Sequence, residues 1–140
     1  MKQFVFYDIK KAFKLILKKE MLYVFFDLIS RNNLNDFEKV QIENLVELID
    51  KEKFEQKLIE EFSVFSNFNV NSNGDYTISN NFTNEIEILS VYDDHILLLS
   101  ENNNSKFLKY ISLHYPNYVV IDVDNKQISS LRLVNPLEIG

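Results

Sequence analysis

The chain has 140 residues and a formal net charge of −6. It contains no cysteine, which excludes disulfides, cysteine-ligated zinc, iron–sulfur clusters and a thiol nucleophile. Its two glycines argue against phosphate-binding loops, in which the backbone must approach the ligand closely. The length suits one domain, and we expect a single domain over residues 1–140, with a mainly helical half at 1–65 and mainly β-hairpins at 66–140.

The charge is unevenly distributed along the chain. Residues 1–35 carry seven basic and three acidic side chains, whereas residues 36–65 and 66–140 each have a net charge of −5. Such a surface repels nucleic acid and anionic membranes and attracts basic partners. No apolar run is long enough for a signal-peptide core or a membrane span, so we expect a soluble, cytoplasmic protein. The abundance of Asn, Lys and Ile suggests a bacterial or phage origin.

The N-terminal part is predicted to be helical. Apolar residues at helical spacing follow Asp8, whose short side chain can cap a helix that runs to about Arg31. The lysine-rich face of this helix can contact a membrane or nucleic acid, but a solvated face is the favoured interpretation. The run Met21–Phe26 is apolar on all sides, which fits either a buried helical segment or a strand.

Two further helices are predicted over 36–49 and 51–65. One continuous helix is the alternative, although the apolar stripe changes phase near Asp50. Asn35 and Glu38 have the spacing of a capping box. The first helix places its apolar side chains on one face, namely Phe37, Leu45, Leu48 and Ile49. The second has the clearest stripe in the chain, formed by Phe54, Leu58, Phe62 and Phe65. The other faces are strongly acidic.

Short apolar segments separated by turn residues predict three β-hairpins after residue 66. Their strands are 68–70 with 76–78, 85–92 with 95–100, and 118–123 with 127–134. Asn73-Gly74 suits the tight turn of the first hairpin. The continuous run Val119-Val120-Ile121 predicts a strand buried on both faces. Residues 105–115 fit a helix capped by Ser105 or a strand, and the helix is favoured.

These elements predict an α+β fold in which about three N-terminal helices pack on one face of a mostly antiparallel sheet formed by C-terminal hairpins. If the hairpins follow one another up and down across the sheet, their tips lie at one end. The aspartates at the tips then form one acidic rim that consists of Asp75, Asp93, Asp94, Asp122 and Asp124.

No motif identifies a chemical reaction. Asp122 and Asp124 lie on one side of a predicted strand and can in principle bind a divalent cation. The following residues do not fit a calcium loop, and hairpin tips favour Asp for turn geometry alone. The two histidines, His95 and His114, are expected to be structural. We therefore expect no catalytic residue, metal site or cofactor.

The expected function is binding of another macromolecule. The leading hypothesis is a non-enzymatic protein-binding inhibitor, an immunity protein or antitoxin that binds and blocks a basic toxin domain such as a nuclease. The alternatives are a phage-type anti-defence protein that mimics DNA, and a metal-dependent enzyme that uses Asp122 and Asp124. Tyrosines around Pro116 either serve an interface or line the core. The candidate partner-binding residues are Glu43, Glu47, Asp50, Glu55, Glu60, Asp93, Asp94, Asp122, Asp124, Tyr110, Tyr115 and Tyr118.

Overall fold

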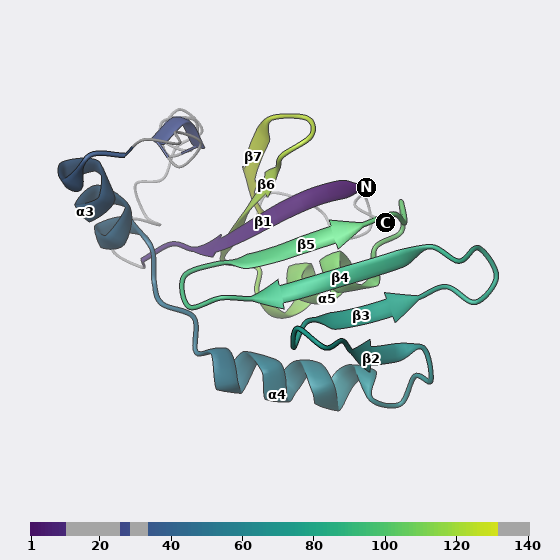
Figure 1. Cartoon of the computed structure of the whole chain (residues 1–140). Coiled ribbons are helices and arrows are strands. Elements are labelled where there is room, and N and C mark those ends of the chain that lie inside the picture. The colour runs from purple at the N-terminus through teal and green to yellow at the C-terminus, as the bar shows by residue number, and fades with distance from the viewer. Residues whose placement is uncertain (11–25, 29–33, 132–140) are drawn as a thin grey trace.

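The computed structural model describes residues 1–10, 26–28 and 34–131 (Figure 1). Its strands form one seven-stranded antiparallel sheet in the order β2-β3-β4-β5-β1-β6-β7. The strands are β1 Lys2–Asp8, β2 Phe68–Val70, β3 Tyr76–Ser79, β4 Ile86–Val91, β5 Ile96–Ser100, β6 Tyr118–Asp122 and β7 Gln127–Ser130. The helices with described bounds are α3 Asp36–Leu45, α4 Lys51–Phe62 and α5 Lys106–His114.

The N-terminal strand β1 lies in the interior of the sheet. Phe6 pairs with Ile96 of β5 on one side and with Val120 of β6 on the other. Side chains alternate along a strand, so Phe4 and Phe6 reach the larger core cluster, while Val5 contacts a smaller cluster on the opposite face. Both faces of β1 are therefore covered with apolar contacts.

The position of β1 overturns the predicted fold. The expectation that N-terminal helices pack on a sheet formed by C-terminal hairpins is wrong, because the sheet includes residues 2–8 between β5 and β6. Asp8 ends a strand instead of capping a helix. Most of the helix predicted over 8–31 lies outside the described residues. Residues 26–28, which the structure does describe, are helical. The continuous apolar run at residues 4–7, which is rich in aromatic and β-branched side chains, was the available signal for a strand covered on both faces.

The three predicted hairpins form, but their tips lie at two ends of the sheet. β1 is inserted between β5 and β6, so these two strands run parallel to each other and the tip of the β6–β7 hairpin points away from the tip of β4–β5. Asp122 and Asp124 consequently lie at the end of the sheet opposite Asp75, Asp93 and Asp94. The predicted single acidic rim is wrong for this reason.

Helices α4 and α5 pack on one face of the sheet, and Figure 1 shows α5 behind the strands and α4 along the β2 edge. They contribute the buried side chains Phe54, Leu58, Phe62, Phe107, Tyr110 and Ile111. The helix predicted over 105–115 is confirmed as α5. Two separate helices form as predicted, but α3 ends at Leu45 and α4 at Phe62, short of the predicted ends at 49 and 65. The chain leaves the helical path at Val46, which bridges to Ile9.

Helix α3 begins as predicted but buries no residue. Asn35 and Glu38 form the capping box, with the Glu38 N–H donating to Asn35 Oδ1 at 2.8 Å. Phe37 and Leu48, expected to face the core, are 70% and 76% exposed. Only partly buried residues such as Leu45 connect α3 to the smaller core cluster. No helix in the described ranges has the length and apolar character needed to cross a membrane.

The predicted Asn73-Gly74 turn joins β2 to β3 and permits a direct stability test. Gly74 has a φ of +82°, and a Cβ built there meets no atom within 4 Å. Gly74→Ala should therefore lower the free energy of unfolding by about 1 kcal/mol, because a left-handed backbone conformation disfavours a side chain. Urea denaturation measures this change. An unchanged or higher free energy would contradict the assigned turn.

Candidate binding surfaces

Helix α4 separates its charges onto two flanks. Phe54, Leu58 and Phe62 face the core at helical spacing. By the same spacing, one side of this buried stripe carries Glu52, Glu55 and Ile59, and Glu60 follows on the outward face; we define these four residues as the acidic flank. The other side carries the basic flank, defined as Lys53 and Lys57.

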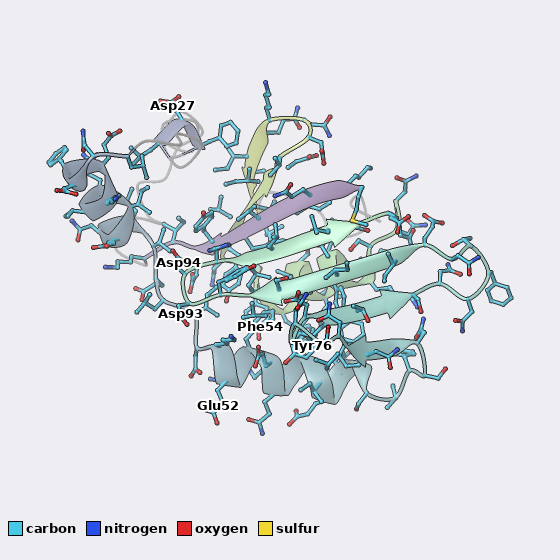
Figure 2. The ribbon with its side chains drawn as sticks, viewed as in Figure 1. Asp27, Glu52, Phe54, Tyr76, Asp93 and Asp94 are labelled. Carbon is cyan, nitrogen blue, oxygen red and sulfur yellow. The ribbon has the colours of Figure 1, made fainter. Side chains whose placement is uncertain are left out.

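The acidic flank lines a shallow depression on the protein surface. Lys51 and Gln56 complete its lining, and Ile59 is 42% exposed within it, so an apolar residue lies among mainly acidic side chains. Figure 2 shows Glu52 pointing away from the body of the protein, whereas Phe54 and Tyr76 lie between α4 and the sheet. Burial, followed by the charge and hydrogen bond of Glu55, raises the pKa of Tyr76, which shows that Glu55 also contacts β3.

None of the acidic-flank carboxylates forms a salt bridge within the described part of the chain, although Lys51 lines the same depression. A close contact between a carboxylate and a basic side chain occurs elsewhere, on the β4–β5 turn, where Asp94 Oδ1 lies 2.6 Å from His95 Nδ1. Three glutamates and one lysine line this depression, and its formal charge is about −2. Exposed carboxylates around an apolar residue form a surface that suits a basic protein partner.

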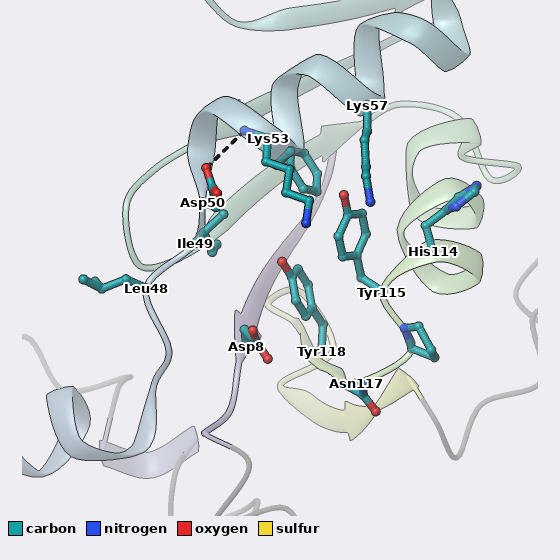
Figure 3. Close-up of a pocket in the computed structure, with 12 residues that line it drawn as sticks. Asp8, Leu48, Ile49, Asp50, Lys53, Lys57, His114, Tyr115, Asn117 and Tyr118 are labelled. Atoms are coloured by element: carbon teal, nitrogen blue, oxygen red, sulfur yellow. Dashed lines mark hydrogen bonds between the residues drawn. The ribbon is translucent and has the colours of Figure 1, made fainter.

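A second surface is the tyrosine pocket, a cavity of about 350 Å³ beside the basic flank (Figure 3). It lies between the N-terminal part of α4, the C-terminal end of α5 and the start of β6. Tyr115 and Tyr118 flank it, with ring centroids 5.0 Å apart and an angle of 28° between the ring planes. The ring of Phe54 lies 5.0 Å from that of Tyr115. The pocket thus combines an aromatic wall with lysine side chains.

The tyrosine hydroxyls of this region retain their protons at neutral pH. Burial, then the charge of Asp8, raises the pKa of Tyr118. Burial and the neighbouring hydroxyl of Tyr115 raise the pKa of Tyr110. The pKa of Tyr115 is also raised by burial, although its hydrogen bond with Tyr110 opposes the shift. These phenols can therefore act as hydrogen-bond donors at pH 7.

Tyr7, at the same end of the sheet, gives a prediction for alkaline pH. Burial, followed by the charge of Asp94, raises its pKa from 10.0 to about 12. The folded state holds this proton more tightly than the unfolded state, so the stabilisation is complete below pH 10 and disappears as the pH rises through about 12. Urea denaturation should show a falling free energy of unfolding over this interval. Tyr7→Phe should reduce the fall, and an equal fall in that variant would contradict the assignment.

The structure brings some predicted partner-binding residues together. Asp50, Tyr115 and Tyr118 line the tyrosine pocket, where Asp50 Oδ1 also accepts the Lys53 N–H at 3.1 Å and caps α4. Glu55 and Glu60 belong to the acidic flank.

The remaining predicted residues are dispersed. Glu43 lies on α3 and Glu47 on the segment that follows it. Tyr110 lies in the core at 6% exposure. Asp93 and Asp94 form the β4–β5 turn near the start of α4 (Figure 2), where the Asp93 carbonyl accepts the Ile49 N–H at 2.7 Å.

Asp122 and Asp124 bond within their own end of the sheet. Both oxygens of the Asp122 carboxylate accept hydrogen bonds from Asn125, and Asp124 Oδ2 accepts the Gln3 N–H at 2.8 Å. No cluster of three or more potential ligands for a metal ion occurs among the residues that the structure describes. These contacts assign both aspartates a role in fixing the β6–β7 turn against β1.

Sequence reasoning missed several residues at these surfaces. Lys53 and Lys57 are not among the predicted site residues, although their i, i+4 spacing places them together on one side of the helix. Asp8 and His114 also line the pocket. Nothing in the local sequence connects them to α4, because they come from β1 and α5.

The chain matches no protein-family model, and no curated protein shows significant similarity to it.

Proposed function

We propose that this protein is a non-enzymatic binding protein that neutralises a basic protein domain, as an immunity protein or antitoxin neutralises a toxin such as a nuclease. The observation that carries the proposal is the acidic flank of α4, where Glu52, Glu55 and Glu60 surround the exposed Ile59. Carboxylates steer a basic partner to this surface, and an exposed apolar residue between them provides area that becomes buried on contact.

The charge distribution of α4 supports the same function. The depression is lined by three glutamates and one lysine, so carboxylates outnumber ammonium groups on this side of the helix. The excess of carboxylates gives the acidic flank a net negative potential that acts over a Debye length, about 8 Å at physiological ionic strength. The buried side chains of Phe54, Leu58 and Phe62 hold the helix to the core, so the acidic flank is preorganised for binding.

Affinity capture tests the proposal. The tagged protein is incubated with lysate of its own source and washed at low and at high salt, and bound proteins are identified by mass. We expect one stoichiometric basic partner that is retained at low salt and weakened at high salt. The Glu52→Gln/Glu60→Gln variant should lose it.

The control is Glu85→Gln/Glu101→Gln, which removes the same charge at the opposite end of the sheet. This variant should retain the partner. Capture of no partner, or equal loss in both variants, would contradict the proposal. Adding duplex DNA then distinguishes the two kinds of inhibitor: displacement from a partner that normally binds DNA indicates DNA mimicry, while a toxic partner indicates immunity.

A further inference from the structure

The tyrosine pocket carries an inference beyond the proposed function, because it lies on the other side of α4 from the acidic flank. Figure 3 shows Lys53 and Lys57 extending toward the hydroxyl ends of Tyr115 and Tyr118. Neither lysine ammonium forms a salt bridge with a carboxylate of the described residues. Two cationic donors are thus available at one cavity.

The tyrosines add neutral donors to these cations. The Tyr118 hydroxyl points into the pocket (Figure 3), and no hydrogen bond of this hydroxyl occurs within the described part of the chain. Because burial and Asp8 keep this phenol protonated, it offers its hydrogen to an acceptor. Ammonium and phenol donors that converge on one space fit the oxygen atoms of an anion, whose charge shortens and strengthens such hydrogen bonds.

The wall of the pocket is suited to an apolar body. Phe54, Tyr115 and Tyr118 present successive aromatic rings, each 5.0 Å from the next. Pro116 and Ile49 also line the cavity. Flat apolar groups gain both buried area and favourable ring contacts on such a surface. The volume of about 350 Å³ is at the lower end of the range for small-molecule sites.

The charges around the pocket limit which anion fits. Asp8 and Asp50 line the same cavity and offset the two lysines in formal charge. Repulsion from these two carboxylates grows with the charge of the ligand, so a monoanion held at the lysine end meets less of it than a dianion such as phosphate. This favours a carboxylate.

We propose that the tyrosine pocket binds a small carboxylate compound with an aromatic body, with its carboxylate between Lys53, Lys57 and the hydroxyls of Tyr115 and Tyr118. The ring of the ligand lies against the aromatic wall. The lysines attract the carboxylate by their charge, and hydrogen bonds from the phenols orient it. The site is independent of partner binding by the acidic flank.

Titration with benzoate tests this site. Two-dimensional NMR of the full chain follows backbone amides while benzoate, the neutral isostere benzamide or inorganic phosphate is added. We expect saturable shifts with benzoate at Lys53, Lys57, Tyr115 and Tyr118. Benzamide and phosphate should bind at least about tenfold more weakly, as expected for the loss of a charge-assisted hydrogen bond or the addition of a second charge.

Variants locate the binding. Lys53→Met/Lys57→Met should weaken benzoate binding by at least about tenfold, while Lys39→Met/Lys109→Met, which removes two exposed lysines elsewhere, should leave it unchanged. Tyr118→Phe should weaken it by a smaller factor. Equal affinity for benzamide, tighter binding of phosphate, or unchanged benzoate binding after loss of Lys53 and Lys57 would each overturn the proposal. The captured partner should still bind the Lys53→Met/Lys57→Met variant, so the two proposals fail separately.

Discussion

Phe6→Ala is expected to lower the free energy of unfolding by about 3–5 kcal/mol. Phe6 is fully buried in β1, where its backbone pairs with both β5 and β6. Removing the ring leaves a cavity at the junction of the two parts of the sheet, and the paired strands on both sides restrict how far the structure can collapse into it. Urea denaturation followed by circular dichroism measures the change.

Phe82→Ala is the matched control for this experiment. Phe82 is 97% exposed in the β3–β4 connection, so the same substitution should change the free energy of unfolding by no more than about 0.5 kcal/mol. If Phe6→Ala proves as mild as Phe82→Ala, residues 2–8 do not form an interior strand. That outcome would contradict the sheet order.

The second large effect is expected from Glu87→Ala, which should lower the free energy of unfolding by about 3 kcal/mol. Glu87 is 2% exposed on β4. Its carboxylate accepts hydrogen bonds from the Ser105 hydroxyl and, at 3.0 Å, from the Lys106 N–H. Ser105 in turn caps α5 through the Leu108 N–H. The substitution therefore leaves buried donors without an acceptor at the start of α5.

Two further variants separate the hydrogen bonds from the charge. Glu87→Gln retains one acceptor oxygen and should lose about half as much stability. Glu101→Ala, at an exposed position after β5, should change the free energy of unfolding by no more than about 0.5 kcal/mol. If Glu87→Ala is as mild as Glu101→Ala, the buried carboxylate does not anchor α5.

Local patterns predicted most elements correctly. The three hairpins, the turn at Asn73-Gly74 and helix α5 with its Ser105 cap are confirmed, because turn residues and caps act over a few neighbouring residues. The strand with Val119-Val120-Ile121 is buried on both faces as predicted. Each of these features depends on short-range chemistry that a sequence displays directly.

Long-range arrangement was not predictable in this way. Nothing near residues 2–8 indicates that this strand pairs between β5 and β6, about a hundred residues away in the sequence. Because β1 lies between β5 and β6, the tip of the β6–β7 hairpin points to the opposite end of the sheet from the β4–β5 tip, which separates Asp122 from Asp94. Glu87 also resembles an ordinary strand residue in the sequence. Its role depends on the packing of α5, whose first N–H groups and Ser105 cap require an acceptor there.

The candidate surfaces were predictable only in part. The negative charge of residues 36–65 indicated an acidic surface, and α4 presents it. The proximity of Lys53 to Lys57 on one side of α4 follows from helical spacing once the bounds of the helix are known. The tyrosine pocket required tertiary contacts, since β1, α4, α5 and β6 all contribute to it.

The measurement that tests the central claim most directly is the association rate constant of the captured partner as a function of salt. If the acidic flank steers a basic partner, the rate should fall at least about tenfold from low to physiological salt. Glu52→Gln/Glu60→Gln should slow association at low salt by about threefold to tenfold, while Glu85→Gln/Glu101→Gln should not. A rate that is independent of salt, or equally slow in both variants, would contradict the role of the acidic flank.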